Sequence, residues 1–248
     1  MKNQYYKNKT KRGLSPRNWA LGSQCRHFKI SVLLLCFIIF GAFRMAAQSP
    51  LEVNGQLSVV GTNLVNEQGT PIQLRGMSSH GLQWHNECYN FNSLSVLVDK
   101  WGIDVFRMAI APSLEKDSWP TTIGYEGNPD FWKKYIDNLV DECGRLGIYC
   151  IIDWHILAPV TDPSDPTVYP TMAKEFWNYM SSKHAGKKQV IYEICNEPSG
   201  VNWSGPKGIK SYADTIITLI RSLTTIISDC PAYCLRLLNN NNLSVVFR

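Results

Sequence analysis

The chain has 248 residues, which is enough for one large domain or two small ones. Hydrophobic residues make up 44% and charged residues 18%, and this composition excludes a disordered, collagen-like or coiled-coil protein. The net charge of +5 comes from the first 47 residues, which carry nine Lys or Arg and no acidic residue. The remainder has 16 basic and 20 acidic residues, so we expect no nucleic-acid-binding surface on the folded part.

Residues 1–47 have the organisation of a targeting segment. A polar, basic stretch up to Lys29 precedes an apolar run over residues 30–43, whose length is typical of a signal-peptide core. A membrane-spanning helix needs roughly 20 apolar residues, and this run ends at Arg44. Small residues Ala46 and Ala47 follow, so we expect cleavage after Ala47 and secretion. The alternative is a chain that stays anchored in a membrane through residues 30–43.

Beyond residue 48 the apolar pattern predicts a small β-hairpin and then four strand–helix units. Short strand-like runs at 57–59 and 63–65, separated by Gly61, predict the hairpin. An Asn92/Ser93 cap is expected to open the first helix. The expected strands are 72–77, 104–110, 149–153 and 190–195, and the expected helices are 93–101, 130–146, about 171–183 and 209–223.

Solid apolar strands that alternate with single helices predict parallel strands covered by helices. No Gly-x-Gly-x-x-Gly follows the first strand, which argues against a dinucleotide-binding fold. Polar residues instead cluster at the carboxyl ends of successive strands, where a (β/α)₈ barrel builds its active site. We therefore predict an α/β fold of the (β/α)₈ TIM-barrel class, with residues 48–221 forming its N-terminal half.

The predicted units stop well short of a whole barrel, which needs roughly 250 residues. The fourth helix ends near Arg221, and residues 222–248 show neither a helix cap nor a strand bounded by turns. We therefore expect an atypical tail and four parallel strands with two bare edges. A frameshift or truncation shortly after Arg221 is the hypothesis that explains this pattern.

Chemically able residues follow each predicted strand. The most specific motif is Ile191-Tyr-Glu-Ile-Cys-Asn-Glu-Pro198, because an apolar strand delivers an amide and a carboxyl side chain to its carboxyl end. One strand earlier, the sequence Ile-Ile-Asp-Trp-His likewise brings polar side chains, an acid and a histidine, to the carboxyl end of an apolar strand. The candidate site residues are Asn196 and Glu197 after the fourth strand, His155 after the third, Arg107 in the second, and His80 and Trp84 after the first.

Together these motifs resemble the glycoside hydrolase family 5 cellulases, in particular secreted bacterial endo-β-1,4-glucanases, over residues 55–221. The resemblance implies a (β/α)₈ barrel that cleaves internal β-1,4-glucosidic bonds with retention of configuration. It implies that Glu197 is the general acid/base, that Asn196 hydrogen-bonds the sugar 2-hydroxyl, and that Arg107 orders the nucleophile carboxylate. It also implies that His155 and His80 line the glycone-side subsites and that Trp84 offers an aromatic face to a glucose ring.

The implied partner is a cellulose-like β-glucan, with no cofactor and no obligate protein partner. We expect no metal ion beside His80, His155 and Glu197, because the neighbouring Arg107 would repel a cation. Retaining hydrolysis needs two carboxyl groups about 5–5.5 Å apart. The family carries the nucleophilic Glu at the end of the seventh strand, and no position here corresponds to it.

Several alternatives stay open. Arg107 could pair with a buried acid, and the histidines could be ordinary core residues. Glu193 is the nearest other acid and is assigned no role. A proton-donating Glu197 needs a pKa above the usual ~4.3, and we expect the apolar strand to bury it. Little or no hydrolysis is expected from this chain alone, so an inactive glucan-binding fragment is one alternative function. A mannanase-type β-glycanase is another, because the fold does not fix the substrate.

Overall fold

A computed structural model describes residues 48–112, 124–156, 165–224 and 245–247 of this protein. These residues all belong to one unit, Gln48–Arg248. The targeting segment predicted for residues 1–47 lies outside the described residues. Within the described ranges, no helix has the length and apolar character needed to cross a membrane.

A short helix and a hairpin come first in the described chain. Helix α2 (Pro50–Asn54) begins at a capping box in which Ser49 and Glu52 satisfy each other's backbone N–H groups. Strands β1 (Ser58–Val60) and β2 (Asn63–Val65) pair antiparallel, which confirms the predicted hairpin. The helix was not predicted, because five residues are too few to show a helical period.

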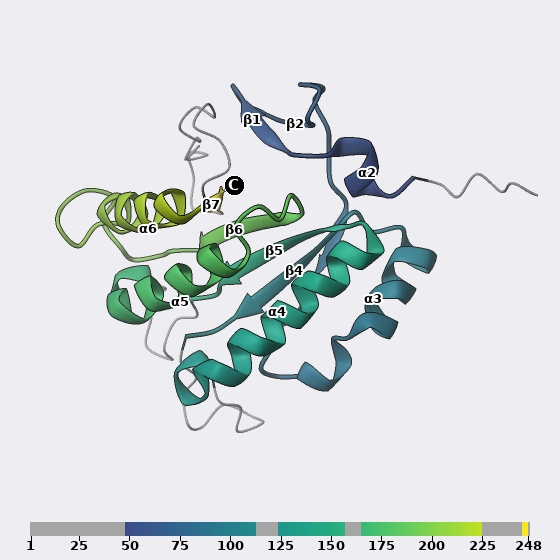
Figure 1. The fold of residues 1–248 in the computed structure, drawn as a ribbon. Coiled ribbons are helices and arrows are strands. Elements are labelled where there is room, and N and C mark those ends of the chain that lie inside the picture. The colour runs from purple at the N-terminus through teal and green to yellow at the C-terminus, as the bar shows by residue number, and fades with distance from the viewer. Residues whose placement is uncertain (1–47, 113–123, 157–164, 225–244, 248) are drawn as a thin grey trace, which may run out of the picture. The chain divides into compact units, whose positions relative to one another are not determined.

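Four parallel strands follow in the predicted order. They are β3 (Gly76–Ser78), β4 (Val105–Ile110), β5 (Tyr149–Trp154) and β6 (Val190–Cys195), and each pairs with the next one along the chain (Figure 1). The prediction of a parallel sheet of strand–helix units is confirmed. Strand β3 is shorter than the expected 72–77 and ends one residue later, because only Gly76–Ser78 pair with β4.

The expectation that both edges of the sheet are bare is wrong for one edge. Strand β7 (Val245–Phe247) pairs antiparallel with β6, with Tyr192 opposite Phe247, and so covers one of the two edges expected to be bare. Backbone pairing, rather than a bounded apolar pattern, defines this strand, which is why the sequence did not reveal it. The outer edge of β3 carries no strand partner in the part of the chain that the structure describes.

Helices pack on one face of the sheet. Figure 1 shows α4 and α5 lying across the same face of β4, β5 and β6. The helices are α3 (Phe91–Val96), which continues as a π-helical turn η2 (Leu97–Trp101), α4 (Pro129–Leu146), α5 (Pro170–Lys183) and α6 (Ile209–Leu223). Short 3₁₀ turns lie in the loops before three of the helices: Asn86–Cys88 before α3, Tyr125–Gly127 before α4 and Pro166–Val168 before α5.

The start of α3 differs from the expected one. The side chain of Asn90, and not that of Asn92 or Ser93, accepts hydrogen bonds from the backbone N–H groups of Asn92 and Ser93. Ser93 takes the third helical position and its hydroxyl accepts from the Asn90 N–H, which completes a capping box. The cap therefore lies two residues earlier, because Phe91 already belongs to the first turn.

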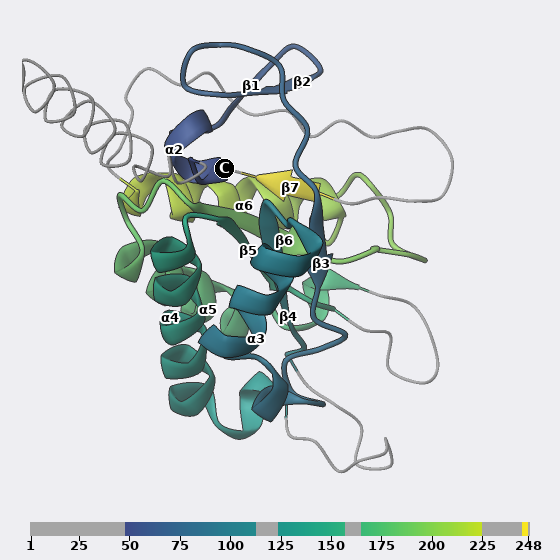
Figure 2. The same ribbon diagram turned by 90° about the vertical axis from the view of Figure 1, so that its right-hand side faces the viewer.

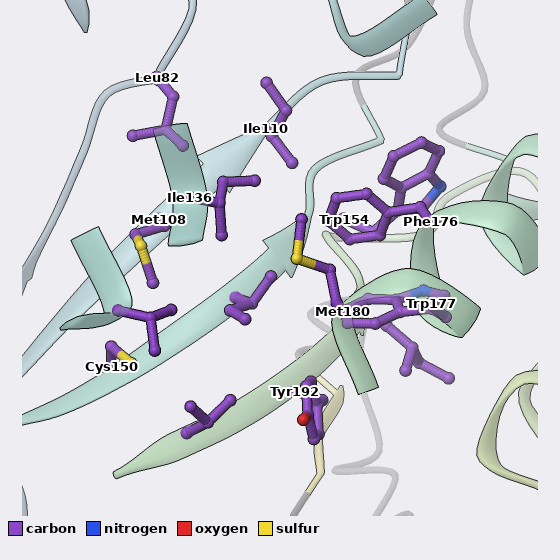
Figure 3. Close-up of a cluster of buried hydrophobic side chains, with 14 of the residues drawn as sticks. Leu82, Met108, Ile110, Ile136, Cys150, Trp154, Phe176, Trp177, Met180 and Tyr192 are labelled. Atoms are coloured by element: carbon purple, nitrogen blue, oxygen red, sulfur yellow. The ribbon is translucent and has the colours of Figure 1, made fainter. Parts of the chain in front are cut away.

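Between the sheet and the helices lies the main hydrophobic core. Alternate residues of each strand point to this face, as the two-residue period of a strand requires. They meet the apolar stripes of helices such as α4 and α5, whose ribbons Figure 2 shows beside the strands. Figure 3 shows side chains of this cluster. The labelled members include Met108, Ile110, Cys150, Trp154 and Tyr192 from the strands and Ile136, Phe176, Trp177 and Met180 from the helices.

The opposite face of the sheet, called the inner face below, changes character along the strands. At the amino ends Val105, Tyr149 and Ile191 form a second apolar cluster with Leu57, which lies just before β1. Two and four residues further along, the same face carries charged side chains instead. The inner face is therefore sealed at the amino ends of the strands and polar toward their carboxyl ends.

Candidate active site

Three strands each contribute one charged side chain to the inner face. Arg107 lies on β4, Asp153 on β5 and Glu193 on β6, and Asp153 stands opposite Glu193 in the strand register. Asp153 is 0% exposed and Glu193 3% exposed. Because buried charges are costly unless paired, these residues are expected to satisfy one another.

The guanidinium of Arg107 binds both acids. Its Nε donates to Glu193 Oε2 at 2.6 Å and its Nη2 donates to Glu193 Oε1 at 2.8 Å, which makes a two-pronged ion pair. The same Nη2 lies 2.8 Å from Asp153 Oδ2. Nη1 donates to Ser78 Oγ on β3 at 3.3 Å. Arg107 thus pairs with core acids, the alternative that the sequence left open, and joins all four parallel strands.

The pKa values of this cluster follow from burial and charge. Burial alone would lower the pKa of Arg107, but the ion pair with Glu193 and the charges of Asp153 and Glu197 outweigh it, so the pKa is raised. Burial raises the pKa of Glu193, and the charge of Asp153 adds to that effect while Arg107 opposes it. Two buried carboxyl groups, those of Asp153 and Glu193, thus share one guanidinium, so the cluster has more acidic groups than basic ones.

Two predicted site residues are attached to this cluster. Asn196 Oδ1 accepts a hydrogen bond from Arg107 Nη2 at 3.1 Å. His155 Nδ1 lies 2.6 Å from Asp153 Oδ2, on the oxygen that also faces Arg107. A carboxylate at that distance holds the hydrogen on Nδ1 and leaves Nε2 as the other functional atom of the ring.

Glu197 follows β6 in an unusual backbone conformation. Its φ is 33°, and it is the only non-glycine residue with positive φ among the residues that the structure describes. Such a conformation is strained for a residue with a Cβ, and strained residues concentrate at functional sites. The side chain of Glu197 is exposed, and the burial expected for it is therefore wrong. The reason is that β6 ends at Cys195, two residues before Glu197.

His80 and Trp84 form a separate aromatic pair after β3. Their ring centroids lie 4.9 Å apart at an interplanar angle of 37°. The backbone N–H of His80 donates to the hydroxyl of Tyr89 at 3.3 Å. A Cβ on Gly81 would lie 2.3 Å from the Trp84 ring, so glycine is what lets the ring lie this close. His80 is exposed and Trp84 half-buried, which leaves aromatic surface open to a ligand.

The structure thus joins Arg107 directly to Asn196, and to His155 through Asp153. The charge of Glu197 also acts on Arg107. Sequence reasoning gave no role to Asp153 or Glu193. The signal for both was strand alternation, which places Asp153 on the same face as His155 and Glu193 on the same face as Ile191.

A sheet of parallel strand–helix units with polar and charged side chains toward the carboxyl ends of its strands is the arrangement found in proteins of the (β/α)-barrel class. Comparison with known families gives the narrower assignment. Residues 65–227 match the family described as cellulase, glycosyl hydrolase family 5. The chain belongs to this family, as the resemblance of its motifs implied.

Individual relatives agree with the family. The chain is 40% identical over 198 residues to an endoglucanase of Clostridium saccharobutylicum, covering 79% of this chain and 41% of that one. The solved structure of cellulase Cel5C_n is 48% identical, with a TM-score of 0.63, covering 71% of this chain and 53% of that one.

The catalytic domain of Thermobifida fusca endoglucanase Cel5A, solved in complex with cellotetraose, is 39% identical to this chain, with a TM-score of 0.62. It covers 71% of this chain and 53% of that one. The chain therefore spans less than half the length of the curated relative and about half of the solved catalytic domains. These neighbours show the fold as a (β/α)₈ barrel of which the described strands form a part.

Proposed function

We propose that this chain is the substrate-binding and proton-donating part of a retaining glycoside hydrolase that cleaves internal β-1,4-glucosidic bonds of cellulose-like β-glucan. Glu197 is the general acid/base. The residues that bind the sugar or support the site are Asn196, His155, Arg107, His80 and Trp84, with Arg107 in a supporting role. The observation that carries the proposal is the Arg107–Asn196–His155 cluster at the strand ends of a family 5 chain. The cellotetraose complex of the T. fusca relative supports a cello-oligosaccharide as the ligand.

The second carboxyl group comes from elsewhere in the enzyme. A nucleophile must present a free carboxylate oxygen to the anomeric carbon. Both oxygens of Glu193 accept hydrogen bonds from Arg107, and Asp153 is fully buried beneath the same guanidinium. Neither is therefore suited to attack a sugar, which supports a nucleophile on a strand outside the four described parallel strands.

The first test compares binding with turnover. We expect the full chain to bind cellotetraose in calorimetry while releasing no reducing sugar from carboxymethylcellulose. This outcome matches the glucan-binding alternative for the chain alone, because the covalent step needs the second carboxylate. Tighter binding of mannotetraose than of cellotetraose would instead favour the mannanase-type alternative.

The second test restores the barrel. Residues 48–224 are joined to the part of cellulase Cel5C_n that this chain does not cover. We expect this hybrid to hydrolyse carboxymethylcellulose and Glu197→Gln to lower its kcat by about 10²–10⁴-fold, because the proton donor is lost. Glu175→Gln, on the exposed surface of α5, is the matched control and leaves the rate unchanged. A Glu197→Gln hybrid as fast as its parent would disprove the assignment of the acid/base.

A further inference from the structure

We propose that Glu193 is a positioning residue of the site, acting through Arg107 to orient the side-chain amide of Asn196 for a sugar hydroxyl. The inference rests on the proposed function for its ligand, but its geometric part stands on the free protein. Glu193 comes from β6 two residues before Cys195, and it is almost completely buried at 3% exposure. It therefore touches Arg107 rather than a sugar.

The first step is the way in which Glu193 holds the guanidinium. A planar guanidinium that meets one acid through Nε and Nη2 has its plane and its rotation set by that acid. Glu193 makes this two-pronged contact at 2.6 and 2.8 Å. Asp153 meets Nη2 alone, at 2.8 Å, and a single contact leaves the plane free to turn about it. Glu193, rather than Asp153, fixes where Nη2 points.

The second step runs from Nη2 to the amide. Arginine has no acceptor, so the atom of Asn196 that faces Nη2 must be the carbonyl oxygen Oδ1. That contact, at 3.1 Å, decides which way the amide is turned. With Oδ1 turned toward Nη2, the remaining polar groups of the amide are the two N–H groups on Nδ2. They are the donors that the site offers to a hydroxyl oxygen.

Glu193 is not needed merely to balance the charge of Arg107. Asp153 already supplies one buried carboxylate to Arg107, so the cluster has a counter-ion without Glu193. A second buried acid adds negative charge at a desolvation cost. A purely structural core would be more stable with one acid, and the second acid is explained by the geometry that it imposes.

The geometric test uses the full chain without sugar. The side-chain Nε–H signal of Arg107, assigned by its loss in Arg107→Lys, is followed by ¹⁵N relaxation. We expect an order parameter near that of rigid backbone, about 0.85, which falls below about 0.6 in Glu193→Gln. Glu175→Gln, which removes an exposed ion pair with Lys133, is the control and leaves the signal unchanged. An Arg107 signal that stays rigid in Glu193→Gln would overturn the proposal.

The functional test is a double-mutant cycle on cellotetraose binding. We expect Glu193→Gln to weaken binding about tenfold in the wild-type background and less than about twofold in Asn196→Ala, because the amide that Glu193 orients is then missing. Independent, additive effects would mean that Glu193 acts on general stability, and they would refute the proposal. Should Glu193→Gln not fold, Glu193→Asp keeps the charge but cannot reach both nitrogens, and the same pattern is expected from it.

The two tests separate this inference from the proposed function. A wild-type chain that binds no cellotetraose contradicts the proposed function, while the Arg107 signal still decides whether Glu193 positions the guanidinium. A chain that binds cellotetraose with additive effects of the two substitutions keeps the proposed function and removes Glu193 from it.

Discussion

At the scale of single residues, burial favours the uncharged form of two ionisable groups, the acid Glu193 and the base His184. Glu193 is held by a two-pronged contact with Arg107 within the inner-face cluster. His184, after α5, is 1% exposed and lies 2.9 Å from Asp137 on α4 through its Nε2 atom. Burial, with help from the charge of Lys187, lowers the pKa of His184 to about 4 against the opposing effect of Asp137.

The lowered pKa of His184 predicts that stability falls on acidification. Between pH 6.5 and about 4 the unfolded chain binds a proton at His184 that the folded chain does not, so the free energy of unfolding decreases as the pH falls through this window. The loss amounts to about 3 kcal/mol, since one pKa unit corresponds to about 1.4 kcal/mol. Urea unfolding at pH 7, 5.5 and 4 measures it.

The control for this prediction is His184→Gln, which keeps a polar side chain that does not titrate. The variant is expected to lose about 3 kcal/mol less than the wild type over the same pH interval. Equal losses in the two proteins would show that other groups cause the acid sensitivity.

At the scale of elements, most boundaries followed from local chemistry. Helix α4 ends at Leu146, as the sequence predicted, and Gly147 caps it with a φ of 69° that suits glycine. Strands β4, β5 and β6 lie within a residue of their expected bounds, because continuous apolar runs bounded by turns are a strong signal. The start of α3 was predicted wrongly, since Asn90, Asn92 and Ser93 are all plausible caps and only the backbone path selects one.

The corrected cap gives a testable difference between two neighbouring asparagines. Asn90→Ala removes the acceptor for two backbone N–H groups of α3 and is expected to lower the free energy of unfolding by about 1 kcal/mol. Asn92→Ala, two residues further, is expected to change it by less than about 0.5 kcal/mol. Chemical denaturation of both variants measures the difference, and a larger loss for Asn92→Ala would restore the cap expected from the sequence.

At the scale of the whole molecule, the order of four parallel strands and their covering helices could be predicted, but the charge network could not. Alternation places Arg107, Asp153 and Glu193 on one face, yet it does not say which nitrogen of Arg107 contacts which acid. These contacts depend on the twist of the sheet and on the reach of the side chains, and Arg107 and Glu193 lie 86 residues apart in the sequence. Strand β7 is a similar case, because its partner β6 lies far away in the sequence.

Export is predicted to remove the first 47 residues. Expression of the full chain with secretion is expected to yield a mature protein that begins at Gln48, because the apolar run 30–43 is too short to span a membrane and small residues follow it. N-terminal sequencing of the secreted protein checks this. Ala47→Pro blocks the cleavage site and serves as the control. A wild-type protein that stays in the membrane fraction with Met1 intact would support the anchored alternative.

The residues by themselves determined the family, the parallel strand–helix order and the identity of the amide and carboxyl group that end β6, because apolar period, turn residues and short motifs are local properties. Only the tertiary structure decided that Glu193 forms an ion pair with Arg107 and that Asp153 contacts both Arg107 and His155. It also decided that Glu197 is exposed and has a strained backbone conformation. The physical reason is that the distance to a partner and the loss of hydration determine how a buried charge is paired. Both are fixed only when the strands lie side by side.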